Sequence, residues 1–200
     1  MEKIYFNNNY NQPLPEKLPK KLKKINFGFY YNQPLPQKLP NSLKSVQFDF
    51  SYNYPLPEQL PQSLEYIYFG HHYNHPLPEK LPQSLKYIDL GYYYDHPLPN
   101  KLPQSLEYID LGQYFDHPLP NELPQSLKMI DFGHFYNQSL PVKLPQSLEE
   151  IRFGYEYDKH LPQNMPLMKN ISNVSFVTNE FVTRVVKREH VCRHQHLFSQ

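Results

Sequence analysis

Three aspartates spaced 21 residues apart are the first side chains in this sequence that could do chemistry together. They are Asp89, Asp110 and Asp131. Carboxylate oxygens are the ligands that hard cations such as Ca²⁺ prefer, so a row of carboxylates could bind such an ion. The alternative is that no ion is bound and that like charges at close range raise the pKa values of these carboxyl groups. We favour the second interpretation and expect no metal ion here.

Histidines are the second group with this spacing, at His75, His96 and His117. The same place in other repeats holds glutamine or tyrosine, which indicates an ordinary surface position rather than a metal site. A third group alternates near the C-terminus, where four zinc-type ligands would share one face of an extended chain: His190, Cys192, His194 and His196. Four ligands on one strand do not easily close a tetrahedron, so we expect a frayed basic tail.

No set of residues points to catalysis. The sequence shows no arrangement of nucleophile, base and orienting residue. Each of the six glycines stands alone, without the spacing of a phosphate-binding loop. We therefore predict that the protein is not an enzyme and has no catalytic residue, cofactor or metal.

The common spacing of these side chains comes from a 21-residue repeat. Its marker, Pro-Leu-Pro, occurs six times with this period, and two degraded copies follow at residues 139–141 and 160–162. A constant period near 20 residues is the signature of a solenoid, in which each repeat packs only on its neighbours. Proline-rich disorder is the competing interpretation, since the chain contains 22 prolines in 200 residues. The periodic placement of the apolar residues argues against disorder.

Each repeat divides into a strand half and a proline half. Leu85, Ile88 and Leu90 are spaced three and then two residues apart, which fits a turn that leads into a short strand. The half around Pro97 cannot be helical and is expected to be polyproline II. The glycines all follow the strand, which indicates a positive φ or a close approach of two coils. An Asn/Asp column is expected to bond local backbone groups, and an aromatic column that includes Tyr94 is expected to lie in the core.

The side chains that alternate with the buried strand residues form an outward face. If Ile67 points inward, Tyr66 and Tyr68 point outward. Grouped exposed tyrosines are typical of binding hot spots, although stacked tyrosines can also simply stabilise neighbouring strands. The candidate partner-binding residues in the middle of this face are Tyr66, Tyr68, Tyr87, Asp89, Tyr108, Asp110 and Asp131.

The repeat unit itself is similar to a known family. The run Leu-Pro-Gln-Ser-Leu-Glu-Tyr-Ile-Tyr-Phe-Gly-His-His-Tyr-Asn-His-Pro-Leu, residues 60–77, resembles an FNIP repeat, and the resemblance extends from residue 4 to about 165. It implies a mainly β, right-handed, leucine-rich-repeat-like solenoid of about eight coils, and a role in protein–protein interaction. Many relatives carry an F-box ahead of the repeats and resemble ubiquitin-ligase adaptors. Here the first expected strand, residues 4–6, begins almost at Met1 and leaves no room for an F-box.

Composition completes the sequence-based expectations. The net charge of +1 does not favour binding to a specific nucleic acid or to a membrane, and the single cysteine fits a reducing compartment. We predict a cytoplasmic monomer with a repeat solenoid over residues 1–165 and a C-terminal cap and basic tail over residues 166–200. The tail fits either a strand or a helix. The protein is expected to bind a partner protein through the concave sheet face; the alternatives are a ubiquitin-ligase substrate adaptor that uses a separate F-box protein, and a decoy without a specific partner.

Overall fold

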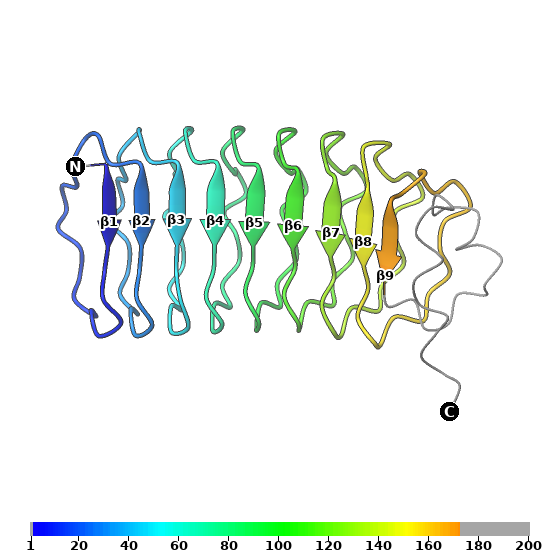
Figure 1. Cartoon of the computed structure of the whole chain (residues 1–200), viewed down its shortest axis with the longest axis horizontal. Helices are drawn as coiled ribbons and strands as arrows, with labels where there is room; N and C mark the ends of the chain where they lie inside the picture. The colour runs from blue at the N-terminus through cyan, green and yellow to red at the C-terminus, as the bar shows by residue number, and fades with distance from the viewer. Residues whose placement is uncertain (1, 173–200) are drawn as a thin grey trace, which may run out of the picture.

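Short strands follow one another at intervals of about one repeat and pair in chain order. The computed structural model describes residues 2–172, and within them Figure 1 shows the strands side by side, all pointing the same way. The nine strands of this part of the chain are β1 (Lys3–Tyr5), β2 (Lys24–Asn26), β3 (Ser45–Gln47), β4 (Tyr66–Tyr68), β5 (Tyr87–Asp89), β6 (Tyr108–Asp110), β7 (Met129–Asp131), β8 (Glu150–Arg152) and β9 (Asn170–Ser172). Every neighbouring pair is parallel, in the order β1 to β9. The predicted leucine-rich-repeat-like β-solenoid is confirmed.

Strands β3 to β8 each begin after a tight turn that contains proline and serine. In the coil of β5, the Leu85 amide donates to the Pro82 carbonyl at 3.1 Å, which closes the turn. The Ser84 hydroxyl donates to the Leu64 carbonyl of the preceding coil at 2.7 Å. Serines at the same place in other repeats make the same bond. The turn therefore both directs the chain into the strand and ties each coil to the one before it.

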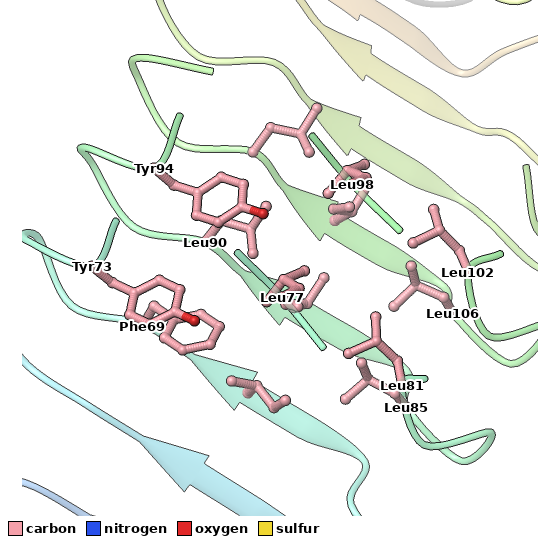
Figure 2. Close-up of a cluster of buried hydrophobic side chains, with 14 of the residues drawn as sticks. Phe69, Tyr73, Leu77, Leu81, Leu85, Leu90, Tyr94, Leu98, Leu102 and Leu106 are labelled. Atoms are coloured by element: carbon pink, nitrogen blue, oxygen red, sulfur yellow. The ribbon is translucent and has the colours of Figure 1, made fainter. Parts of the chain in front are cut away.

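The core lies between the strand half and the proline half of every coil. Ile88, in the middle of β5, is only 1% exposed, while the strand residues on either side of it are half-buried. Figure 2 shows Leu98 of the proline half on the side of Leu90 and Tyr94, which follow the strand, and Leu102 of the proline half beside Leu106, which precedes the next strand. The aromatic column is buried as predicted, and the rings of Tyr94 and its counterpart one coil earlier stack at 6.1 Å. The proline half itself contains neither helix nor strand in the described residues.

The glycines follow the strands because neighbouring coils come very close there. Gly91 has a φ of +79°, and a Cβ atom at this position would lie 2.1 Å from the Gly70 carbonyl oxygen. Gly112 has a φ of +76°, and its Cβ would lie 1.7 Å from the Gly91 oxygen. Both reasons predicted for this column, positive φ and close approach, therefore apply at these two positions.

The Asn/Asp column has the predicted structural role, but its hydrogen bonds run between coils. The side-chain oxygen of Asn53 accepts a bond from the Asn74 amide of the next coil at 3.0 Å, and the Asn74 side chain does the same for the Asp95 amide. The expectation of local bonds within one coil was wrong. A side chain of this length spans the ~5 Å between parallel strands, so it bonds to the next coil instead.

The C-terminal end of the sheet extends past residue 165. Strand β9 pairs in parallel with β8, with Ile151 opposite Ile171. The boundary between solenoid and cap stays a prediction, because the tail residues lie outside the described part, His190, Cys192, His194 and His196 among them. Residues 2–172 contain no helix that is long and apolar enough to cross a membrane.

Candidate functional site

The strand register brings the seven predicted residues together on one face. Tyr66, Tyr87 and Tyr108 are direct partners on β4, β5 and β6. Tyr68 begins the neighbouring column, which continues through three aspartates at the ends of β5, β6 and β7: Asp89, Asp110 and Asp131. We call this set of seven the Tyr–Asp face. Its assembly follows from the constant repeat length, because each strand pairs with the strand one repeat later.

The tyrosines of this face pack on one another and also remain accessible. The rings of Tyr68 and Tyr87 are 4.7 Å apart, and those of Tyr87 and Tyr108 are 6.2 Å apart. Tyr108 is 37% exposed, and the other tyrosines of the face are half-buried. Burial, followed by the charges of Asp89 and Asp110, raises the pKa of Tyr87 to about 12. Its hydroxyl is therefore protonated at neutral pH and can donate a hydrogen bond.

The aspartates are held in place by the glycine turn. One carboxylate oxygen of Asp89 accepts a bond from the Gly91 amide at 2.9 Å, and Asp110 accepts one from Gly112 at the same distance. Asp131 repeats the contact at 3.1 Å. Since each carboxylate has two oxygens, this leaves the second oxygen, Oδ2, for other contacts.

The negative charges of these three aspartates are only partly balanced by nearby positive charges. Burial, together with the charges of Asp89 and Asp131, raises the pKa of Asp110 to about 6, against the lowering effect of the Gly112 amide. Burial likewise raises the pKa of Asp89. Arg152 lies 3.6 Å from Asp131 and also binds Glu150. No lysine or arginine within residues 2–172 forms an ion pair with Asp89 or Asp110. Burial is the main cause of the raised pKa values of Asp89 and Asp110, and the like charges that the sequence indicated make a smaller contribution.

The histidines that the sequence offered as possible metal ligands contact backbone oxygens or a carboxylate instead. Within the described part of the chain, no group of three or more His, Cys, Asp or Glu is arranged to hold a metal ion. The Nε2 atoms of His75 and His96 lie 3.1 Å from the backbone oxygens of Asn53 and Asn74. The Nε2 atom of His117 lies 3.0 Å from a carboxylate oxygen of Asp95.

A depression beside the aspartates was not predicted from the sequence. It is open, has a volume of about 390 Å³, and lies where β3 to β6 end. Gly70, Gly91 and Gly112 are part of its lining, and we call them its floor because they carry no side chain. The lining also includes Asp89 and Asp110, which precede the glycines in the chain, and the rings of Phe50, His71 and Tyr92, which come directly after the glycine position. We call it the glycine trough. The signal in the sequence was an aromatic or histidine directly after the glycine position, which varies too much between repeats to stand out.

A column of charged residues at the position just before each strand was also not predicted from the sequence. It alternates in sign over much of its length and consists of Glu2, Lys23, Lys44, Glu65, Lys86, Glu107, Lys128, Glu149 and Lys169. Glu65 binds Lys44 at 2.7 Å and Lys86 at 3.3 Å, which are its neighbours in the adjacent coils. These hydrogen bonds, Lys44 first, lower the pKa of Glu65. This column therefore has a stabilising role at the sheet surface.

Comparisons with known proteins identify the family of the repeats and a solved structure of similar fold. Residues 31–72, 73–114, 96–135 and 136–165 match the family model of the FNIP repeat and together cover more than half of the chain. Among solved structures, the chain is similar to CroV588, a giant-virus protein described as a novel circular leucine-rich-repeat protein. The TM-score is 0.74 at 29% identity, over 83% of this chain and 26% of that protein. The chain thus spans about a quarter of the length of CroV588. No curated protein of similar sequence was found.

Proposed function

The chain belongs to the FNIP repeat family, and on that premise we propose that it is a non-catalytic module that binds a partner protein on the Tyr–Asp face. Leucine-rich-repeat-like solenoids generally mediate protein–protein interaction and are typically non-enzymatic scaffolds. The partner, and the expectation that the protein acts as a cytoplasmic monomer without nucleic acid or membrane, stay predictions.

The observation that carries the proposal is the combination, on one sheet, of half-exposed tyrosines with carboxylates that form no ion pair to a lysine or arginine of residues 2–172. The tyrosine rings already pack against each other, with 4.7 Å between Tyr68 and Tyr87. Little side-chain entropy is therefore lost when a partner covers them, and they can contribute a large contact area. Asp89 and Asp110 lie in the next column and add polar groups of fixed direction. An apolar centre beside oriented polar groups is the usual composition of an interface hot spot.

The test uses the full-length chain and a matched pair of tyrosines. Tyr108, on the Tyr–Asp face, and Tyr54, at the start of a proline half, are both 37% exposed. A partner is first isolated with the tagged wild-type protein from the native host cell, and its affinity for purified variants is then measured by calorimetry. Tyr108→Ala should weaken binding by about tenfold or more, which is typical for a hot-spot tyrosine. Tyr54→Ala should leave the affinity unchanged.

Two results would contradict the proposal. Equal effects of Tyr108→Ala and Tyr54→Ala on affinity would mean that the partner does not use this face. A second variant, Tyr87→Ala, separates recognition from folding: it should weaken binding and lower the free energy of unfolding by only about 1 kcal/mol, the scale of a cross-strand pair. Loss of a cooperative thermal melt in Tyr87→Ala would assign the tyrosine column to structure.

A further inference from the structure

We infer that the partner protein inserts an arginine or lysine side chain into the glycine trough. This inference rests on the proposed function, because it names the chemistry that the partner must present beside the Tyr–Asp face. It is carried by the shape of the trough, by the sign of the charges along it, and by the apolar wall opposite those charges.

The shape of the trough is a consequence of the close approach of the coils. A Cβ atom on Gly91 would meet a backbone oxygen of the preceding coil at 2.1 Å, so this column carries no side chain from Gly70 to Gly112, and Asp49 occupies the equivalent place in the coil of β3. The neighbouring columns do carry side chains, and they stand up on both sides of the glycine floor. Phe50, His71 and Tyr92 form a continuous ring stack, with centroid distances of 4.7 and 4.3 Å. The trough therefore runs across successive coils between a carboxylate wall and an aromatic wall.

The charge along the trough has one sign. Its lining includes Asp49, Asp89 and Asp110 but no lysine or arginine. Burial, and then the neighbouring His72, lowers the pKa of the His71 imidazole, which favours the neutral form of this ring. A guanidinium or ammonium group placed here would form charge-assisted hydrogen bonds with the second oxygens of Asp89 and Asp110. No residue on the floor or the walls would repel it.

The aromatic wall suits the rest of such a side chain. Lysine and arginine bury their methylene stems against apolar surface while the charged head reaches polar partners. The Phe50–His71–Tyr92 stack supplies that surface, and the carboxylates of Asp89 and Asp110 line the same depression. A small metal ion fits less well, because one oxygen of Asp89 and one of Asp110 are already bonded to glycine amides.

The inference is tested with a synthetic peptide of alternating glycine, serine and arginine, and with the same peptide carrying uncharged citrulline for arginine. Calorimetry measures their binding to the full chain and to the variant Asp89→Asn/Asp110→Asn. Asparagine keeps the oxygen that accepts the glycine N–H, so the turn is retained. The arginine peptide should bind the wild type and lose about tenfold in affinity on the double variant, as expected for close charge pairs. The citrulline peptide should not bind.

A matched control and three contrary results define the outcome. Glu79→Gln/Glu122→Gln makes the same change in net charge at exposed carboxylates of the proline half, and it should leave the affinity for the arginine peptide unchanged. An equal loss in this control would reveal general charge attraction and overturn the inference. Equal binding of the citrulline peptide would exclude recognition of a cation. A rise in affinity in the full-length variant Lys187→Gln/Arg188→Gln would show that the chain's own tail occupies the trough, and would refute a partner as its occupant.

Failure of this inference is distinguishable from failure of the proposed function. If Asp89→Asn/Asp110→Asn binds the arginine peptide like the wild type while Tyr108→Ala still weakens binding of the partner, the trough assignment is wrong and the Tyr–Asp face stands. If Tyr108→Ala binds the partner normally, the face is wrong, whatever the arginine peptide does.

Discussion

Replacing Asp110 by asparagine should make the protein more stable at neutral pH, although it removes a side chain that makes a good hydrogen bond. Asp110 lies on β6 between Asp89 on β5 and Asp131 on β7, and Arg152 on β8 faces the row from its end. Burial and these neighbouring carboxylates raise its pKa from an ordinary value of 3.8 to about 6. The ionised form is therefore less favourable in the folded protein than in the unfolded chain.

The sign and size of the effect follow from linkage between proton binding and folding. Between pH ~4 and ~6 the folded protein binds more protons at this site than the unfolded chain, so the free energy of unfolding falls as pH rises through this window. A difference of about 2 pKa units corresponds to an upper limit of about 3 kcal/mol at pH 7.5. Asparagine still accepts the Gly112 N–H, but less strongly than a carboxylate does. We expect a net gain of about 1 to 2 kcal/mol, or roughly 2 to 6 °C in Tm.

The assay is thermal and urea unfolding followed by circular dichroism from pH 4.5 to 7.5. Asp110→Asn should be more stable than the wild type at pH 7.5, and the difference should shrink as pH falls through about 6 and vanish near pH 4.5. Glu122→Gln, which removes an exposed carboxylate of the proline half, serves as the control and should follow the wild type. Lower stability of Asp110→Asn at pH 7.5, or a difference that does not depend on pH, would refute the reasoning.

Two further predictions concern the core and the floor of the trough. Ile88→Asp should abolish the cooperative thermal melt, because it places a charge at a site that is 1% exposed and offers no partner, which costs about 4 kcal/mol or more; a melt within a few degrees of the wild type would contradict the assignment of the core. Gly91→Val should lower the free energy of unfolding in urea by at least about 2 to 3 kcal/mol, because it combines a φ of +79° with a Cβ position 2.1 Å from the Gly70 oxygen. A loss below ~0.5 kcal/mol would show that the coils can separate here.

The fold and the membership of the Tyr–Asp face could be predicted from sequence because both follow from one covalent period. When every repeat has the same length, residues one repeat apart must lie side by side in a parallel stack, so Tyr66, Tyr87 and Tyr108 had to become neighbours. The direction of each side chain then follows from one buried residue per strand. Ile88 points inward, and its two neighbours in β5 must therefore point outward.

The glycine trough and the bonds between coils could not be predicted in the same way, because they depend on distances across the stack. The sequence shows that glycine recurs, but the depth of the floor depends on how closely Gly91 approaches the Gly70 carbonyl. The aromatic wall carries Phe50, His71 and Tyr92 at equivalent places, and the next repeat has a glutamine there. A pattern with such mixed chemistry gives only a weak periodic signal.

In both charged columns of the strand half, charges recur at the spacing of the coils. The two columns differ in the sign of neighbouring charges. In the column before the strands, Glu65 lies between Lys44 and Lys86 and pairs with both, so charges that repeat at the spacing of the coils attract one another. In the Asp column the same sign recurs on β5, β6 and β7, and burial makes the repulsion felt at Asp110. Alternating signs would have been the stabilising choice at that column too. A local arrangement that lowers stability beside exposed tyrosines is typical of a surface adapted to a ligand, and the basic side chain that we propose for the partner would relieve this repulsion. The same carboxylates that destabilise the free protein are thus the ones that should favour its complex with a basic partner.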